Sequence, residues 1–143
     1  MIDEKVKYYG TVNRAIGCPS FEITRLDRAG RRGVGWYASD RQMTNTYLFI
    51  SPFVVNGGQD ITDDSLSATQ ILIVPKNSVQ QLAKECGLGD IDLIERAEAL
   101  VNTYETGLYR GDKAYDRVSP GRLWLTYSAG LVEKPVNMVI PRD

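Results

Sequence analysis

The sequence predicts a single α+β domain over residues 1–143, and three observations support this class. Segments near both ends alternate apolar and polar side chains with the period of two that strands require. Between them, residues 77–107 repeat apolar side chains at helical spacing and contain two glycine stops. A chain of 143 residues suits one domain with its own core. Strands, two helices and further strands predict a sheet that pairs distant segments.

The N-terminal third reads as strands. "KVKYYGTV" (5–12) and "FEITRLDR" (21–28) alternate apolar with polar residues. "RRGVGWYAS" (31–39) predicts a third strand that is broken by glycine. "NTYLFISPFVV" (45–55) fits either a short helix or a strand, because Pro52 interrupts it.

An acidic segment and an apolar segment come next. "GGQDITDDS" (57–65) predicts a surface loop. "ATQILIVP" (68–75) is rich in β-branched residues, and this composition predicts a buried strand.

Two helices are then expected. The first covers "NSVQQLAKECG" (77–87), with Asn77 or Ser78 as N-cap and Gly87 as its stop. The second covers "DIDLIERAEALVNTYETG" (90–107), with Asp90 as cap, and one apolar face made by Ile91, Ile94, Ala97, Leu100 and Val101. "RLWLTYSAGL" (122–131) and "PVNMVI" (135–140) predict two closing strands.

Composition excludes several kinds of chemistry. The chain has no histidine, which removes Ser-His-Asp and Cys-His catalysis and histidine-ligated zinc. Cys18 and Cys86 are isolated, so we expect reduced thiols and no metal site. The net charge of −1 argues against nucleic acid as the main partner. No apolar run approaches the ~20 residues that span a bilayer, and the N-terminus lacks a secretion signal, so a cytoplasmic protein is expected.

Two tyrosines stand ten positions apart in "GVGWYASDRQMTNTY" (33–47). One interpretation is ordinary packing with the hydroxyls in water, the commonest state of tyrosine. The other is a slot that clamps a flat heteroaromatic ring, because glycines permit close approach of the backbone and hydroxyls can bind polar groups. The residues of that slot are Gly35, Tyr37, Ser39, Thr44 and Tyr47.

The same segment resembles the nicotinamide-binding segment of ADP-ribosyltransferases of the diphtheria-toxin and poly-ADP-ribose polymerase type. In that family a G-x-G-x-Y motif is followed by a small residue, a Ser or Thr, and a second tyrosine. The resemblance implies that Tyr37 stacks on nicotinamide, Thr44 binds its carboxamide and Tyr47 covers the other face. It also implies a split β-sheet core with two central helices, and NAD as substrate without a metal.

Upstream, "KYYGTV" (7–12) resembles the family's first strand, which carries H-G-T or H-G-S. Gly10 and Thr11 match this motif, and Tyr9 stands where the family has histidine. The family's histidine bonds a ribose hydroxyl, so the resemblance gives Tyr9 that role in binding and catalysis. A tyrosine hydroxyl can donate a similar hydrogen bond from a longer side chain.

The family also has a glutamate that opens a late strand, and Asn137 of "PVNMVI" occupies this position. A carboxylate there supports the positive charge of the transition state, which a neutral amide does poorly. Glu133, just ahead, is the other candidate. In "RAGRR" (28–32), Arg31 and Arg32 would reach the pyrophosphate of NAD, or else form a solvated hairpin.

Three functions remain open at this stage. The first is a mono-ADP-ribosyltransferase that modifies a host or partner protein, as small phage and effector transferases do. The second is an inactive module on the same fold that binds NAD or a related nucleotide. The third is a small, oligomeric α+β protein whose eight tyrosines contribute to a protein-binding surface.

Overall fold

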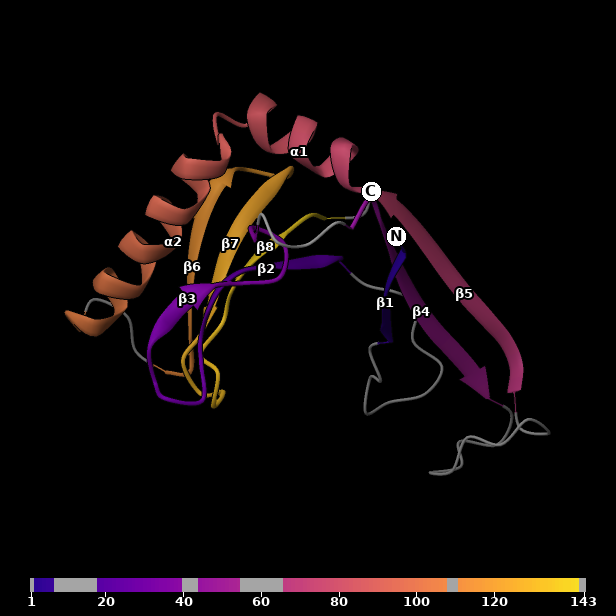
Figure 1. The fold of residues 1–143 in the computed structure, drawn as a ribbon, viewed down its shortest axis with the longest axis horizontal. Coiled ribbons are helices and arrows are strands. Elements are labelled where there is room, and N and C mark those ends of the chain that lie inside the picture. Colours follow the sequence, from indigo (N-terminus) through magenta and orange to yellow (C-terminus); the bar gives the residue numbers. More distant parts are fainter. Residues whose placement is uncertain (1, 7–17, 40–43, 55–65, 108–110, 142–143) are drawn as a thin grey trace.

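The computed structural model describes residues 2–6, 18–39, 44–54, 66–107 and 111–141. These residues form an α+β fold with a three-stranded sheet, a five-stranded sheet and two helices (Figure 1). The predicted class and the order of strands, helices and strands are therefore confirmed. An ADP-ribosyltransferase core is a finer statement, and it stays a prediction.

The three-stranded sheet has the order β1 (Ile2–Val6), β4 (Thr46–Val54), β5 (Leu66–Pro75). β1 runs parallel to β4, and β5 runs antiparallel to it. The segment that fitted either a helix or a strand is thus the central strand. Among the described residues, β1 pairs with β4 as far as Ile50, and at Pro52 β4 is bordered by β5 alone. An edge position of this kind tolerates a residue without an N–H group.

The five-stranded sheet is antiparallel throughout. Its order is β3 (Arg32–Val34), β2 (Ser20–Leu26), β8 (Val136–Val139), β7 (Leu123–Ser128), β6 (Lys113–Ser119). Helix α2 (Asp90–Glu105) lies along one face of this sheet (Figure 1). We call this the inner face, and its pairing register aligns Phe21, Met138 and Leu125, all of them fully buried.

Helix α1 (Lys76–Glu85) follows β5 directly and connects it to α2 along the top of the fold in Figure 1. Its N-cap is Pro75, so the expected cap at Asn77 or Ser78 was wrong by about two residues. Proline already holds the extended backbone that precedes a first turn. The predicted stop is confirmed, since Gly87 has a φ of 83°.

The second helix begins at Asp90, but its N-cap is Gly89 rather than Asp90. The carboxylate of Asp92 accepts a hydrogen bond of 2.9 Å from the Gly89 N–H group, which satisfies a donor at the helix start. Ala97, Leu100 and Val101 are buried as expected, and Leu93 joins them. Gly107, with a φ of 83°, follows the helix end.

Three strand predictions need correction. The third strand covers Arg32–Val34 and not residues 31–39. The strand expected to be buried, β5, lies at a sheet edge, and the side chains of Ile71 and Ile73 are 54% and 61% exposed. β6 was not predicted, because Ala114 is its only fully buried residue.

Other expectations fall partly outside the described residues. The strand predicted for residues 5–12 meets β1 at Lys5 and Val6 only, and its remainder and the acidic segment 57–65 lie outside. Cys18 and Cys86 are both free thiols. Among the helices that the structure describes, none is both long and apolar enough to cross a membrane.

Candidate functional site

Tyr37 and Tyr47 belong to an aromatic cluster in the core. Each is 3% exposed, their ring centroids are 6.2 Å apart and their planes meet at 43°. Phe21 of β2 packs against both rings, with centroid distances of 5.5 Å and 5.3 Å. Trp36 contacts the rings of Phe21 and Tyr47. The structure thus brings the two predicted tyrosines together, inside the hydrophobic core.

This geometry differs from a nicotinamide clamp. Two faces that enclose a planar ring must be nearly parallel and about 7 Å apart, which is twice the van der Waals contact distance of about 3.5 Å. Tyr37 and Tyr47 are closer and tilted. A ring could enter between them only after the side chains had moved. Their role in ligand binding stays a prediction.

The structure describes some of the other predicted binding residues and not others. Thr44 is buried and Ser39 is half-buried, whereas Tyr9, Gly10 and Thr11 lie outside the described residues. Gly35 has a structural role of its own, because a Cβ atom there would lie 2.6 Å from the backbone oxygen of Glu22. The close approach that this glycine permits is an approach to β2.

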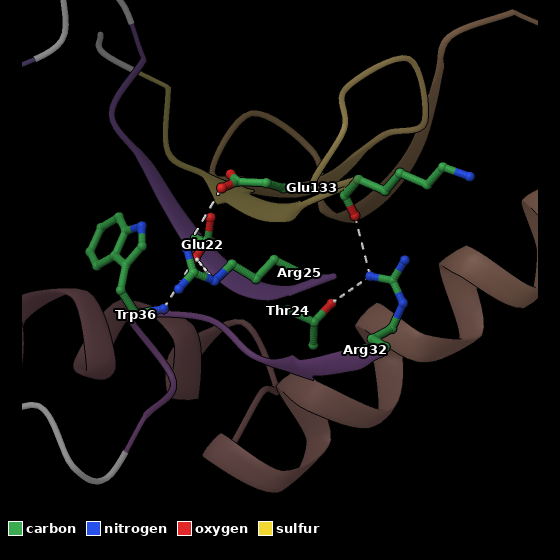
Figure 2. Close-up of polar contacts among 7 residues, drawn as sticks. Glu22, Thr24, Arg25, Arg32, Trp36 and Glu133 are labelled. Carbon is green, nitrogen blue, oxygen red and sulfur yellow. Dashed lines mark hydrogen bonds and ion pairs between the residues drawn. The ribbon is translucent and has the colours of Figure 1, made fainter. Parts of the chain in front are cut away.

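Glu22 is a buried carboxylate that the sequence interpretation missed, and it is 7% exposed. Its Oε1 accepts a hydrogen bond of 3.3 Å from the backbone N–H of Trp36 and lies 3.6 Å from Nε of Arg25. Nη1 of Arg25 lies 4.0 Å from Oε1 of Glu133. Figure 2 shows Arg25 between the two carboxylates. An arginine in this position offsets part of the cost of burying a charge.

Asn137 lies directly opposite Glu22 in the pairing of β8 with β2. Residues that are directly opposite in an antiparallel pair share one face of the sheet. The same register continues from Asn137 to Thr126 and from Thr126 to Tyr115. This row crosses the face of the five-stranded sheet opposite to its inner face, which we call the outer face. A carboxylate and an amide thus stand side by side where the resemblance requires a glutamate.

The two arginines of the basic turn have separate roles. Arg31 is an exposed hairpin residue whose Nη2 lies 3.0 Å from the Asp27 carboxylate. Arg32 donates hydrogen bonds of 3.3 Å to Thr24 Oγ1 and to the Lys134 carbonyl oxygen (Figure 2). Its guanidinium carbon also lies 5.4 Å from the ring centroid of Tyr127. Their binding of pyrophosphate stays a prediction.

The Tyr127 phenol is the clearest electrostatic perturbation near these groups. Burial raises the pKa of Tyr127 above its usual value of 10.0, the Arg32 cation acts in the opposite direction, and Glu105 and Tyr104 add to the increase. The phenol is therefore kept neutral as part of the packing between the sheet and α2.

One hollow in the described surface has the chemistry of a ligand site. It measures about 460 Å³ and lies at the β6–β7 hairpin, where Tyr115, Arg117 and Trp124 line it. We call it the hairpin hollow. Tyr115 is 48% exposed, Arg117 is exposed and Trp124 is half-buried. Two rings and one guanidinium therefore surround a space of the size that small-molecule sites have.

A second hollow of about 390 Å³ lies between α2 and the β2–β3 hairpin. Arg32 and Lys134 line it together with Glu98 and Glu105. Charges of both signs compensate one another there, and no aromatic ring contributes to the lining. Among the described residues, no group of three or more acidic, cysteine or histidine side chains is placed to hold a metal ion.

Comparison with protein-family models, with curated proteins and with solved structures finds no match to this chain. The resemblance to ADP-ribosyltransferases thus rests on the motif residues alone.

The sequence contained weak signals for the residues that were missed. Glu22 occupies a polar position of an alternating strand, which normally indicates a solvated side chain. Trp124 was assigned to a closing strand without a functional role, and Tyr115 belongs to the strand that was not predicted. The signal available for both residues was an aromatic side chain at a strand position that is normally polar and faces solvent.

Proposed function

We propose that this protein binds NAD or a related nucleotide at the hairpin hollow. The observation that carries the proposal is that Tyr115, Trp124 and Arg117 converge on one space of about 460 Å³. Aromatic rings stack on a base, and a guanidinium pairs with phosphate oxygens in a two-pronged geometry. Nucleotides combine these two chemical features.

The outer face extends this site toward a carboxylate. Thr126 and Asn137, both half-buried, follow Tyr115 along one register row, and Glu22 completes the row. Neighbouring strands are about 4.8 Å apart, so the row spans roughly 14 Å from Tyr115 to Glu22. Hydroxyl, amide and carboxylate groups along this row suit the sugar hydroxyls of a nucleotide.

Transfer of ADP-ribose to a protein is the second candidate function, and the neighbouring positions of Glu22 and Asn137 favour it. In this reaction the bond between nicotinamide and the ribose carbon breaks. An acceptor group bonds to that carbon and loses a proton. A carboxylate stabilises the positive charge that develops on the ribose. Glu22 is the residue we assign to this role, with Arg25 and Glu133 positioning it.

Binding is tested by calorimetry with NAD, ADP-ribose, AMP and nicotinamide. We expect Tyr115→Ala and Trp124→Ala to weaken NAD binding about tenfold each, because a stacked ring contributes ~1–3 kcal/mol. Arg117→Gln should weaken NAD and AMP but leave nicotinamide unchanged. Lys113→Gln is the matched control, since Lys113 is an exposed cation of the same strand outside the hollow.

Tyr37→Leu and Tyr47→Leu separate this proposal from the nicotinamide clamp. Both variants remove a ring that would stack on nicotinamide and keep an apolar side chain in the core, so NAD affinity at the hairpin hollow should not change once thermal melting shows that the variant is folded. Loss of NAD binding in these two variants, with no loss in Tyr115→Ala, would refute the hollow as the site. Absence of binding by the unmodified protein would refute nucleotide binding altogether.

Transfer is tested by incubating the protein with labelled NAD and cell extract. We expect a labelled protein band that Glu22→Gln abolishes, because the amide keeps the hydrogen bond from Trp36 but lacks the charge. Glu133→Ala and Asn137→Ala should reduce labelling less. Thermal melting of each variant is the control for folding. Labelling that survives in Glu22→Gln but fails in Asn137→Ala would contradict the assignment of Glu22.

A further inference from the structure

β5 is an unusual edge strand. Within the residues that the structure describes, it pairs with β4 alone and lies on the outer side of the fold (Figure 1). It is ten residues long, and its sequence LSATQILIVP contains no charged residue. Its one proline, Pro75, is the last residue. The N–H and C=O groups that point away from β4 are a template for another strand.

The other three sheet edges carry the features that normally prevent such pairing. β1 contains Asp3, Glu4 and Lys5 in five residues. β6 contains Lys113, Asp116 and Arg117, and its pairing with β7 is interrupted by a bulge or irregularity. β3 is only three residues long. Charges, irregular pairing and short length all oppose edge-to-edge association. Among the edges of the two described sheets, β5 is the one that is both long and free of charge, and its pairing with β4 is irregular at one end only, between Phe53 and Val54.

The apolar surface of β5 continues onto β4. Ile71 is 54% exposed and Ile73 is 61% exposed, and they pair with Ile50 and Leu48 respectively. These four residues share one face of the three-stranded sheet, because directly opposite residues point the same way. Another uncharged strand with an apolar face would pair with this edge and extend the sheet.

We propose that β5 pairs antiparallel with β5 of a second copy of this chain, which joins two three-stranded sheets into one of six strands. A two-fold axis closes this contact, so each copy uses the same residues and no filament grows. The neutral strand suits a second copy, since no like charges meet when the same strand lies on both sides of the axis. This inference does not depend on nucleotide binding.

The pleat restricts the register. The two large exposed apolar residues of β5, Ile71 and Ile73, have odd numbers, and a shift by one residue would place them opposite residues of the other face. The residue numbers of two β5 residues that lie opposite each other must therefore add up to an even number. The register that puts Ile71 opposite Ile71 of the second copy, and Ile73 opposite Thr69, keeps both faces continuous. It also uses nearly the whole strand.

Sedimentation velocity tests the association directly. A strand-edge contact is a small interface, so we expect a concentration-dependent dimer over about 1–200 µM. The mass should rise from 16.0 kDa toward twice that value. Ile71→Lys and Ile71→Glu should each stay monomeric, because like charges then meet at the axis, and an equal mixture of the two should restore the dimer. Circular dichroism checks that each variant is folded.

Cross-linking provides an independent measurement on the folded protein. In a Cys18→Ser, Cys86→Ser background, Ile71→Cys should form a disulfide-linked dimer under mild oxidation, since opposed strand residues lie ~4.5–5.5 Å apart. Lys113→Cys, on the charged β6 edge, is the control and should not link. A wild-type chain that stays at 16.0 kDa at every concentration overturns the proposal. So does an Ile71→Lys dimer, or a mixture that does not associate.

Discussion

Gly35→Ala is expected to destabilise the fold strongly, although it adds a single methyl group. The new Cβ would lie 2.6 Å from the Glu22 carbonyl oxygen, 2.8 Å from its carbonyl carbon and 2.8 Å from its Cγ. Two of these atoms belong to the backbone of β2, so a rotamer change cannot remove the clash. The chain from Gly35 to Tyr37 must therefore move away from β2.

The cost has two parts. Overpacking a closed site costs roughly 1–3 kcal/mol. Movement of this segment also weakens the hydrogen bonds from the Gly35 N–H to the Ile23 oxygen and from the Tyr37 N–H to the Glu22 oxygen. Each contributes about 0.5–1.5 kcal/mol. We expect a total loss of roughly 2–4 kcal/mol in the free energy of unfolding, which lowers Tm by about 6–12 °C in a chain of this length.

Urea denaturation followed by circular dichroism measures this loss. Gly33→Ala is the matched control, because an added Cβ at Gly33 meets nothing within 4 Å. Its free energy of unfolding should stay within about 0.5 kcal/mol of the parent value. If Gly35→Ala is as stable as Gly33→Ala, the close contact with Glu22 is not a constraint of the fold, and a ligand would be the better explanation for Gly35.

Three further results are expected. Leu125→Ala, at a fully buried position, should cost ~2–5 kcal/mol in a denaturation experiment, whereas Leu131→Ala, at a position that is 57% exposed, should cost little. The Arg122 guanidinium lowers the pKa of Glu85 below its usual 4.5. This pair therefore stabilises the fold above pH 4.5, and its contribution is lost as the pH falls through the pKa that Glu85 has in the folded protein. In an NMR titration, Arg122→Ala should return the pKa of Glu85 toward 4.5. In an ultraviolet titration, Arg32→Ala should raise the pKa of Tyr127 further, because it removes the cation that opposes burial, while Arg31→Ala should leave that pKa unchanged.

The helices were the most predictable part of the fold because their signals are local. Apolar side chains at helical spacing and a glycine in the left-handed region lie within one segment, and both helix ends were found to within a few residues. The caps were misassigned because Pro75 and Gly89 precede the polar residues that usually cap.

The strands depended on pairing that no single segment contains. The apolar run of β5 indicated burial, but an edge strand has a neighbour on one side only, and this position follows from the sheet order. β6 is charged and buries little, so its sequence resembles a loop. The third strand ends at Val34, which pairs with Thr24. The segment after it stays beside β2 through hydrogen bonds from the Gly35 N–H to the Ile23 oxygen and from the Tyr37 N–H to the Glu22 oxygen.

The same limit explains the site. The sequence indicated that Tyr37 and Tyr47 are close, and they are, but it did not reveal that Phe21 lies against both rings. Burial of Glu22 arises from β8 and from the segment after β3, which are distant in the chain. The residue types within one segment predicted which side chains were candidates for the site. Packing between distant segments decides which of those side chains are exposed to solvent.

Gly35, Trp36 and Tyr37 can all be explained by packing alone. The absent Cβ lets residues 35–37 close on β2, which puts the Trp36 N–H on Glu22 and the Tyr37 ring against Phe21. A motif that the core already explains is weak support for a ligand. Tyr115 and Arg117 are different, because the core does not need an exposed ring and an exposed cation beside Trp124. The proposal of nucleotide binding therefore depends on these residues, and a bound nucleotide that contacts neither of them would contradict it.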